Sequence, residues 1–221
     1  MKLSITLPAR DDELPKTLRH VIRKLFFTLK SFKDTAYSYY GDRPYSMILY
    51  IYYGLFRINT FLIFECDLGG NIAEPNIELP FRAVTPTLEG LDRLRKGRDL
   101  PREFFYDKIH DVDNCCLALF GEEIAYIHWL YFKGDYSRFL VLDESTCEIN
   151  YFFTLPKYRG RGLSSKMLAH STRYLREQGY RKAVVVVHQN NVSFIKNIRK
   201  LPFQETRRIR TFGPFNRKVA V

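Results

Sequence analysis

A short cationic segment after an apolar stretch carries the clearest chemical signal in the sequence. It reads Lys157-Tyr-Arg-Gly-Arg-Gly-Leu-Ser164, and Leu163 opens a run of apolar residues at helical spacing. Two glycines let the backbone turn and present successive N–H groups, and the start of a helix adds partial positive charge. The segment could therefore hold a phosphate group. Because two-glycine turns also occur in proteins that bind nothing, the surrounding residues must decide.

The distribution of charge points to an anionic ligand in the same part of the chain. The protein has 221 residues and a formal net charge of +11. Residues 151–221 hold 16 Lys and Arg against 2 acidic residues, which is +14, and residues 1–150 hold 19 against 22, which is −3. Charge alone does not distinguish a nucleic acid, a membrane surface and a small polyphosphate.

The elements that must position the segment alternate between strand and helix patterns. Strands are expected over residues 77–84, 115–120, 124–132, 139–142, 148–155, 183–187 and in one or two stretches after 206. Helices are expected from a cap at Thr85 or Thr87 to residue 96, and over 101–112, 163–179 and 192–200. This order predicts a mixed α/β sheet with helices on both faces.

The N-terminal third follows different patterns. Residues 12–33 show helical spacing with a cationic opposite face, which we interpret as a surface helix, although such a helix can also lie on anionic lipid. The apolar run 47–64 contains Arg57 and Asn59 and is too interrupted to span a membrane, so we interpret it as a pair of strands. Loop residues over 67–80 predict a division into an extension, 1–76, and a main domain, 77–221.

The four cysteines lack metal-ligand spacing and the density of a disulfide scaffold. We therefore expect reduced thiols, a cytoplasmic location and no metal site. Residues 1–8 are too short for the apolar core of a secretion signal.

Three stretches together resemble the GNAT superfamily of acyl-CoA N-acyltransferases. Its Arg-x-x-Gly-x-Gly or Ala motif corresponds to Arg159-Gly-Arg-Gly162-Leu-Ser164, with the frequent lead-in present as Pro156-Lys-Tyr. Val185-x-Val187-x-x-x-Asn191 is similar to the family's fifth strand and the asparagine after it, and Lys200-Leu-Pro-Phe203 to its Lys-Leu-Gly-Phe. Ser164 and Pro202 depart from the pattern. The resemblance covers roughly residues 77–213.

The resemblance implies a mostly antiparallel sheet in which two adjacent parallel strands splay apart and admit the pantetheine arm of coenzyme A. Acetyl-CoA or a longer acyl-CoA would be the co-substrate. Backbone N–H groups of Phe153, Thr154 and Leu155 would hold the pantetheine and the thioester oxygen. The diphosphate would lie on the motif and helix start, and the remaining implied binding residues are Arg159, Gly160, Arg161, Gly162, Leu163, Ser164 and Asn191.

Catalysis by this family suggests two candidate side chains. Several members keep a glutamate base near the position of Glu148, and strand alternation would place Glu148, Asn150, Phe152 and Thr154 on one face. The alternative to a catalytic base is that Glu148 is a solvated or ion-paired glutamate at the start of a strand. His128 and His188 are other candidates for the base. The family's usual tyrosine acid falls at Ile198, so we expect Tyr151, or else Tyr158, to supply the proton.

These expectations favour an N-acyltransferase that acts on a primary amine of a small metabolite, sugar or amino acid. The competing interpretation is a non-catalytic module that binds acyl-CoA, a membrane or a nucleic acid on a degenerate acyltransferase fold. A nucleic acid is not the expected partner, and contact with an anionic membrane surface and homo-oligomerisation stay open.

Overall fold

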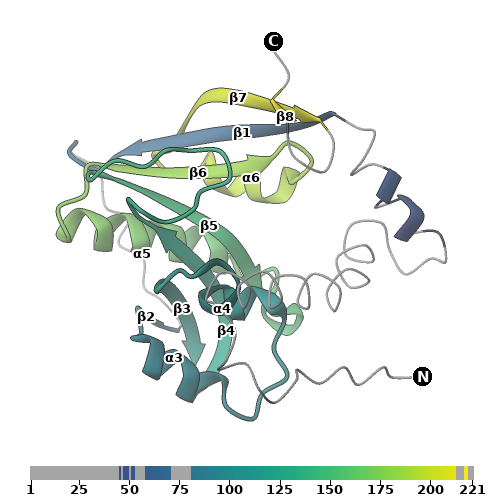
Figure 1. Ribbon diagram of the computed structural model, residues 1–221. Coiled ribbons are helices and arrows are strands. Elements are labelled where there is room, and N and C mark those ends of the chain that lie inside the picture. The colour runs from purple at the N-terminus through teal and green to yellow at the C-terminus, as the bar shows by residue number, and fades with distance from the viewer. Residues whose placement is uncertain are drawn as a thin grey trace, which may run out of the picture.

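A computed structural model describes residues 45, 47–49, 51–52, 58–70, 81–212 and 217–218. Within them an 8-stranded sheet has the order β2-β3-β4-β5-β6-β1-β7-β8 (Figure 1). All neighbouring strands are antiparallel except β5 and β6, which are parallel. The strands are β1 Ile58–Asp67, β2 Arg82–Val84, β3 Asn114–Phe120, β4 Glu123–Tyr131, β5 Thr146–Thr154, β6 Lys182–His188, β7 Gln204–Phe212 and β8 Arg217–Lys218.

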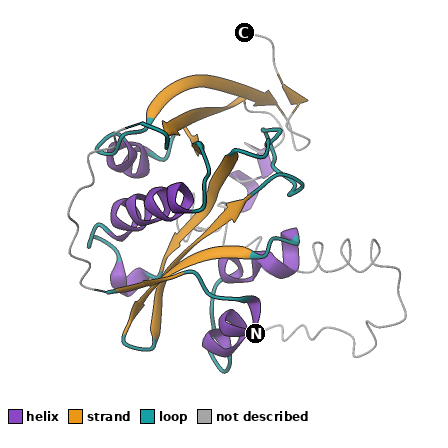
Figure 2. Ribbon diagram, turned by 90° about the vertical axis from the view of Figure 1, so that its left-hand side faces the viewer, coloured by secondary structure: helices purple, strands orange, loops and turns teal. Residues whose placement is uncertain are grey.

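Helices cover both faces of this sheet, as the sequence predicted (Figure 2). They are α3 Leu88–Arg95, a 3-10 turn at Arg102–Phe105, α4 Tyr106–His110, a 3-10 turn at Pro156–Tyr158, α5 Leu163–Glu177 and α6 Val192–Ile198. One hydrophobic cluster packs α5 and α6 on one face, and a second packs α3 and α4 on the other. We call these the α5 face and the α4 face.

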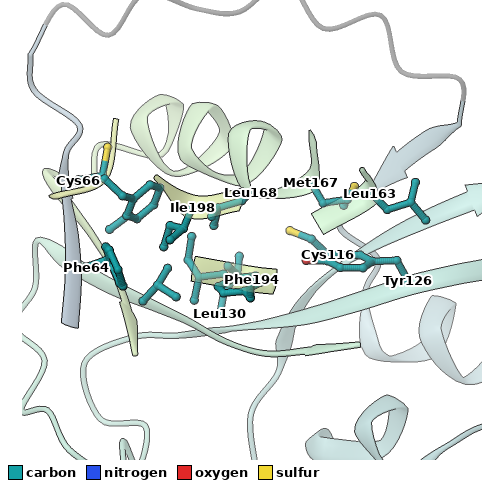
Figure 3. Packing of buried hydrophobic residues seen from close by; sticks show 14 of the residues in the cluster. Phe64, Cys66, Cys116, Tyr126, Leu130, Leu163, Met167, Leu168, Phe194 and Ile198 are labelled. Atoms are coloured by element: carbon teal, nitrogen blue, oxygen red, sulfur yellow. The ribbon is translucent and has the colours of Figure 1, made fainter. Parts of the chain in front are cut away.

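Most predicted elements of the C-terminal two thirds are confirmed, with small shifts of their ends. The helix expected over 101–112 is a 3-10 turn followed by α4, and the strand expected over 77–84 is described only from residue 82. Thr87 is the N-cap of α3, because its hydroxyl accepts a hydrogen bond from Gly90 N at 3.2 Å. The apolar positions of α5 that gave the helical spacing, including Leu163, Met167 and Leu168, are buried against the sheet (Figure 3). Burial of this stripe is what holds the helix in place.

The interpretation of residues 47–64 as two strands is wrong in its first half. Residues 47–49 and 51–52 are helical, and the strand β1 begins only at Ile58. None of the helices in the described part of the chain is both long and apolar enough to cross a membrane. The predicted helix over 12–33 lies outside the described residues.

Strand β1 comes from the N-terminal third of the chain but lies inside the sheet. It pairs with β6 on one side, where Phe61 faces His188, and with β7 on the other, where Ile58 faces Phe212. Ile63 and Phe64 are almost completely buried there. The boundary at residue 76 stays a prediction, since 71–80 lie outside the described residues, but β1 shares its sheet with the elements beyond that boundary.

The short strand predicted over 139–142 is not formed. Residues 132–145 instead make an extended connection between β4 and β5, with turns at 133–134 and 144–145. Its apolar residues Leu140 and Leu142 pack into the cluster of the α4 face, which explains their strand-like pattern.

Candidate functional site

The predicted phosphate-binding segment forms a tight turn between β5 and α5. Gly160 and Gly162 have φ values of 77° and 69°, a left-handed conformation that other residues rarely adopt. Gly162 is the N-cap of the 15-residue helix α5, and no side chain caps that end. The first N–H groups of such a helix have no partner within the helix. Backbone donors and the helix dipole therefore meet at this turn, as an anion site requires.

The turn is fastened to the β3–β4 hairpin. The carboxylate of Glu123 accepts hydrogen bonds from Lys157 Nζ and the Tyr158 hydroxyl, and these bonds lower the pKa of Glu123. The Tyr158 ring stacks on Phe120 with centroids 4.8 Å apart. The Arg161 guanidinium lies 5.4 Å from the centre of the Tyr158 ring. These contacts hold the turn in one conformation.

The parallel strands beside the turn separate. Strands β5 and β6 pair only from Thr146–Lys182 to Glu148–Val184, and the rest of each strand diverges (Figure 1). Leu155 N donates to Ala125 O on β4 at 2.9 Å, so this N–H group is occupied. Because peptide groups alternate in direction, those of Thr154 point away from β4 and toward the opening. Arg159 Nε donates to the Thr154 carbonyl at 3.2 Å, and the Thr154 N–H points to the same side of the strand.

A bulge in β5 corrects the predicted face of the catalytic candidates. Ile127 pairs with Phe153 and Trp129 with Asn150, so two residues of β5, Tyr151 and Phe152, oppose one residue of β4, and Tyr151 has a φ of 55°. The extra residue shifts the alternation. Phe152 packs on the α5 face against Phe194, with ring centroids 4.5 Å apart, and therefore does not share a face with Glu148.

The same bulge brings Tyr151 to the α4 face, to which Glu148 also points. Cys147 and Ile149 point into the α5 cluster, so Glu148 between them points to the other side. The Tyr151 ring also packs in the α4 cluster, with its centroid 4.4 Å from that of Tyr106 and 4.8 Å from that of His110. Sequence alternation alone would have separated Glu148 and Tyr151.

Glu148 is fully buried and incompletely partnered. Asn150 Nδ2 donates to Oε1 at 2.7 Å, whereas Oε2 is buried without a hydrogen-bond partner among the described residues. Burial raises the pKa of Glu148 above the ordinary glutamate value, and the nearby Ser137 hydroxyl and Asn150 amide oppose this shift. The alternative of a solvated glutamate is wrong, and Glu148 forms no ion pair with any of the residues that the structure describes. A buried carboxylate with raised pKa and a vacant acceptor oxygen suits a general base.

Tyr151 is suited to hold a proton at neutral pH. Burial raises its pKa to about 12, partly offset by the charge of Arg138. Its hydroxyl therefore stays protonated under physiological conditions. A left-handed φ at a large residue is a strained conformation of the kind that the surrounding fold must impose, and such strain gathers at functional sites.

The surroundings of the two histidine candidates indicate structural roles. His128 is fully buried between the Tyr126 hydroxyl, 2.9 Å from Nδ1, and the Ser171 hydroxyl, 2.7 Å from Nε2, and burial lowers its pKa to about 3. His188 Nε2 lies 3.2 Å from Oδ1 of Asn59 on the neighbouring strand β1, and His188 Nδ1 accepts a hydrogen bond from Asn190 N at 3.2 Å. Sequence reasoning missed Asn59, because nothing in its neighbourhood showed that β1 lies beside β6.

The residues after β6 cap helix α6 and pack it against the sheet. The Asn191 side chain accepts from Phe194 N at 3.3 Å and caps α6. Ile198, at the position of the family's tyrosine, is 1% exposed and lies in the α5-face core (Figure 3). A side chain at that position points into the core, which agrees with a proton donor supplied from elsewhere.

A separate open cleft of about 710 Å³ lies at the opposite end of β5 and β6. It is lined by residues such as Glu65, Thr146 and Lys182, where the two strands are still paired. None of the candidate residues above lines it, so we do not connect it with the chemistry at the diverging ends.

The fold, the turn and the separated parallel strands define an acyltransferase architecture, and comparison with known families agrees. The model of the Acetyltransferase (GNAT) family matches residues 87–201, just over half of the chain. The protein belongs to this family. None of the curated proteins matches the chain.

Solved structures confirm the fold at low sequence identity. A GNAT-family protein of Novosphingobium aromaticivorans is 14% identical with a TM-score of 0.50, over 70% of this chain and 63% of its own. A GNAT-family acetyltransferase of Colwellia psychrerythraea is 15% identical with a TM-score of 0.52, over 89% and 73%. A glucosamine N-acetyltransferase region of a fungal multi-domain β-N-acetylglucosaminidase is 15% identical with a TM-score of 0.54, over 76% and 23%. The chain thus spans under two thirds of the length of the first and third of these structures.

The residues of the site fit coenzyme A, which this family uses as the carrier of the acyl group. A Cβ added at Gly160 or Gly162 would meet no atom within 4 Å, so open space adjoins the turn. Arg159 and Arg161 flank that space and are exposed. Phosphate could therefore reach the backbone donors, and the pantetheine could follow the Thr154 peptide into the gap between β5 and β6.

Proposed function

We propose that this protein is an N-acyltransferase that moves an acetyl or longer acyl group from coenzyme A to a primary amine of a small metabolite, sugar or amino acid. The observation that carries the proposal is the divergence of β5 and β6 next to the left-handed turn at Gly160 and Gly162. A buried carboxylate, Glu148, lies on the strand that leads into that turn. The glucosamine N-acetyltransferase region of similar fold is compatible with a small-molecule acceptor.

The reaction requires a neutral amine, a polarised thioester and a protonated leaving thiol. Glu148, directly or through water, would accept the proton that the amine loses as its nitrogen bonds to the thioester carbon. The Thr154 N–H would stabilise the oxygen of the tetrahedral intermediate. As the carbon–sulfur bond breaks, Tyr151 would donate its proton to the sulfur and be reprotonated from solvent.

The experiment is thermal protection by acetyl-CoA and longer acyl-CoAs, followed by free-thiol release with a panel of primary amines. Gly162→Asp should abolish both effects, because it places a negative charge where the diphosphate would lie. Gly179→Asp is the matched control. Gly179 also has a positive φ, of 84°, and open space at its Cβ, but it follows the far end of α5. No protection of the wild-type protein by any acyl-CoA would refute the proposal.

A second candidate function is a non-catalytic module that binds acyl-CoA or an anionic surface. It is favoured by the burial of Ile198, where the family's acid is expected, and by exposed cations along β7, namely Arg207, Arg208 and Arg210. Binding to anionic liposomes or nucleic acid that falls steeply with salt, with no thiol release, would select this alternative.

A further inference from the structure

Asn150 joins the buried carboxylate to the bulge of β5. Its side-chain oxygen accepts a hydrogen bond from the backbone N–H of Tyr151 at 2.8 Å, and its Nδ2 donates to Glu148 Oε1 at 2.7 Å. Asn150 pairs in register with Trp129 of β4, whose ring lies in the α4 cluster, so the Asn150 side chain is on the same face as Glu148. One amide group therefore contacts both the candidate base and the residue whose φ is 55°.

The orientation of this amide is fixed by its two partners. A backbone N–H can only donate, so the oxygen of the Asn150 amide must face Tyr151 and its nitrogen must face Glu148. An amide nitrogen donates and does not accept, so it interacts more strongly with an ionised carboxylate than with a carboxylic acid. Burial raises the pKa of Glu148, and the hydrogen bond from Asn150 opposes that shift. The contact therefore favours the form of Glu148 that can accept a proton.

The two oxygens of Glu148 have different surroundings as a result. Oε1 is held by Asn150, whereas Oε2 is buried without a hydrogen-bond partner among the residues of the described ranges. A general base needs an acceptor oxygen within hydrogen-bond reach of the proton that it takes, directly or through one water. Oε2 is the oxygen of Glu148 that is left for this contact.

We infer that Asn150 is a positioning residue for the base: it holds Glu148 through Oε1, so that Oε2 accepts the proton of the acceptor amine. The inference rests on the proposed acyl transfer and adds a residue that acts through Glu148 and touches no reacting atom. Because Asn150 also binds the backbone N–H of Tyr151, the position of the carboxylate is tied to the backbone conformation at the bulge.

The other ionisable groups around Glu148 differ in what they do near neutral pH. On β4, Tyr131 pairs in register with Glu148, and burial raises its pKa, as burial raises the pKa of Tyr151 to about 12. Both tyrosines therefore stay protonated. His110 of α4 packs against the Tyr151 ring and lies 3.1 Å from the Tyr131 hydroxyl, and histidine titrates between pH 5 and 8. A pH profile must therefore distinguish Glu148 from His110. Three further groups complete these surroundings, namely Ser137, Arg138 and Arg102.

The test is Asn150→Asp, which keeps the shape of the side chain. The new carboxylate still accepts from the Tyr151 N–H, but it cannot donate to Glu148 and it repels the charge of Glu148. In thiol release from acetyl-CoA, the rising limb of kcat against pH should move to higher pH. At a pH on that limb kcat should be about 10-fold lower, with recovery above it. KM for acetyl-CoA should change little.

A limb that stays in place, as it would if His110 produced it, would overturn the inference and leave the acyltransferase standing. If the charged variant does not fold, Asn150→Ala takes its place, because it removes the donor without adding a charge. The limb should then move in the same direction, and an unmoved limb again overturns the inference. Absence of both thermal protection and thiol release in the wild-type protein would instead refute the proposed function itself.

Two further variants place the effect on the contact between Asn150 and Glu148. In the Glu148→Gln protein, Asn150→Asp should lower kcat little further, because a positioning residue acts through the carboxylate, and losses that simply multiply would contradict this. Asn114→Asp is the matched control. Asn114 is half-buried at the start of β3 and pairs with Leu130 of the α5 cluster, so its side chain is on the opposite face from Glu148. If Asn114→Asp moves the limb as far as Asn150→Asp does, the effect is long-range electrostatics and Asn150 is not a positioning residue.

Discussion

The Tyr158 hydroxyl donates a hydrogen bond to the Glu123 carboxylate, which ties the phosphate-binding turn to the hairpin between β3 and β4. Glu123 itself lies away from the gap between β5 and β6, on a strand that follows a two-residue turn at residues 121–122. It is therefore a positioning residue for the turn, and its removal should affect the binding of the co-substrate more than the chemical step.

Glu123→Gln is expected to raise KM for acetyl-CoA about 3- to 10-fold with little change in kcat, because a charge-assisted bond to the turn is weakened. Steady-state kinetics at saturating amine give both constants. Glu122→Gln is the comparison, since the Glu122 side chain is mostly exposed and its carboxylate lies 3.7 Å from the Arg82 guanidinium and not against the turn. A fall in kcat with unchanged KM would show that Glu123 has another role.

Glu148→Gln should lower kcat about 100-fold or more, the usual contribution of a general base. In the wild-type protein the rate should rise with pH through a pKa above the ordinary glutamate value, since burial raises the pKa of Glu148. Tyr151, with a pKa of about 12, should cause no falling limb near neutral pH. A pH–rate profile of both proteins decides this, and unchanged kcat in the variant would exclude Glu148 as the base.

The same substitution should stabilise the fold at neutral pH. The folded-state pKa of Glu148 is raised, so the ionised carboxylate is less favourable in the folded state than in the unfolded chain. Glutamine removes this cost, and melting temperatures should exceed those of the wild type at pH 7 to 8. The advantage should shrink as the pH falls through the raised folded-state pKa and should be gone below the unfolded glutamate pKa, where both states are protonated. Lower stability of the variant at pH 7 would contradict a buried carboxylate whose ionised form destabilises the fold.

His128→Ala should destabilise the protein by roughly 2–4 kcal/mol, because it leaves a cavity and removes the partner of the Tyr126 and Ser171 hydroxyls. The kcat of the folded protein should not change. The pKa of His128 is lowered to about 3 by burial, so the unfolded chain binds its proton first as the pH falls from about 6.5. The wild type should lose stability over that range, and the variant should lose less. Denaturant unfolding at several pH values measures both effects.

A fragment that begins at residue 77 contains the whole region matched by the family model but lacks β1. Its sheet would have two unpaired strand edges, β6 and β7, in place of buried pairs. We expect this fragment to be aggregated or unfolded by circular dichroism and gel filtration. A monomeric fragment with cooperative unfolding would show that residues 77–221 fold alone and that β1 is an addition to a complete domain.

Local signals made most of the fold predictable. Helix α5 has a continuous apolar stripe and a glycine start, and Val184 to Val187 can hardly be other than a buried strand, so short-range sequence was enough. The position of β1 was not predictable, since it depends on pairing with Val185 and Arg208 far along the chain. The strand expected over 139–142 failed because apolar residues that cover a sheet show the same pattern as residues within one.

The candidate site was predictable from the sequence to a similar extent as the fold. The turn at Gly160 and Gly162 has a motif and was located correctly. The arrangement of Glu148 and Tyr151 depends on a bulge in β5. The bulge could not be predicted from the residue types, because its left-handed position is occupied by a tyrosine and not by a glycine.

The placement of β1 also bears on how the chain folds during synthesis. Phe61 leaves the ribosome early, yet its partners His188 and Ile209 are made only near the end of translation. Until then the apolar residues of β1 have no native neighbours, and contacts between such distant segments form slowly. The nascent protein should thus depend on chaperones more than relatives whose central strands are adjacent in sequence.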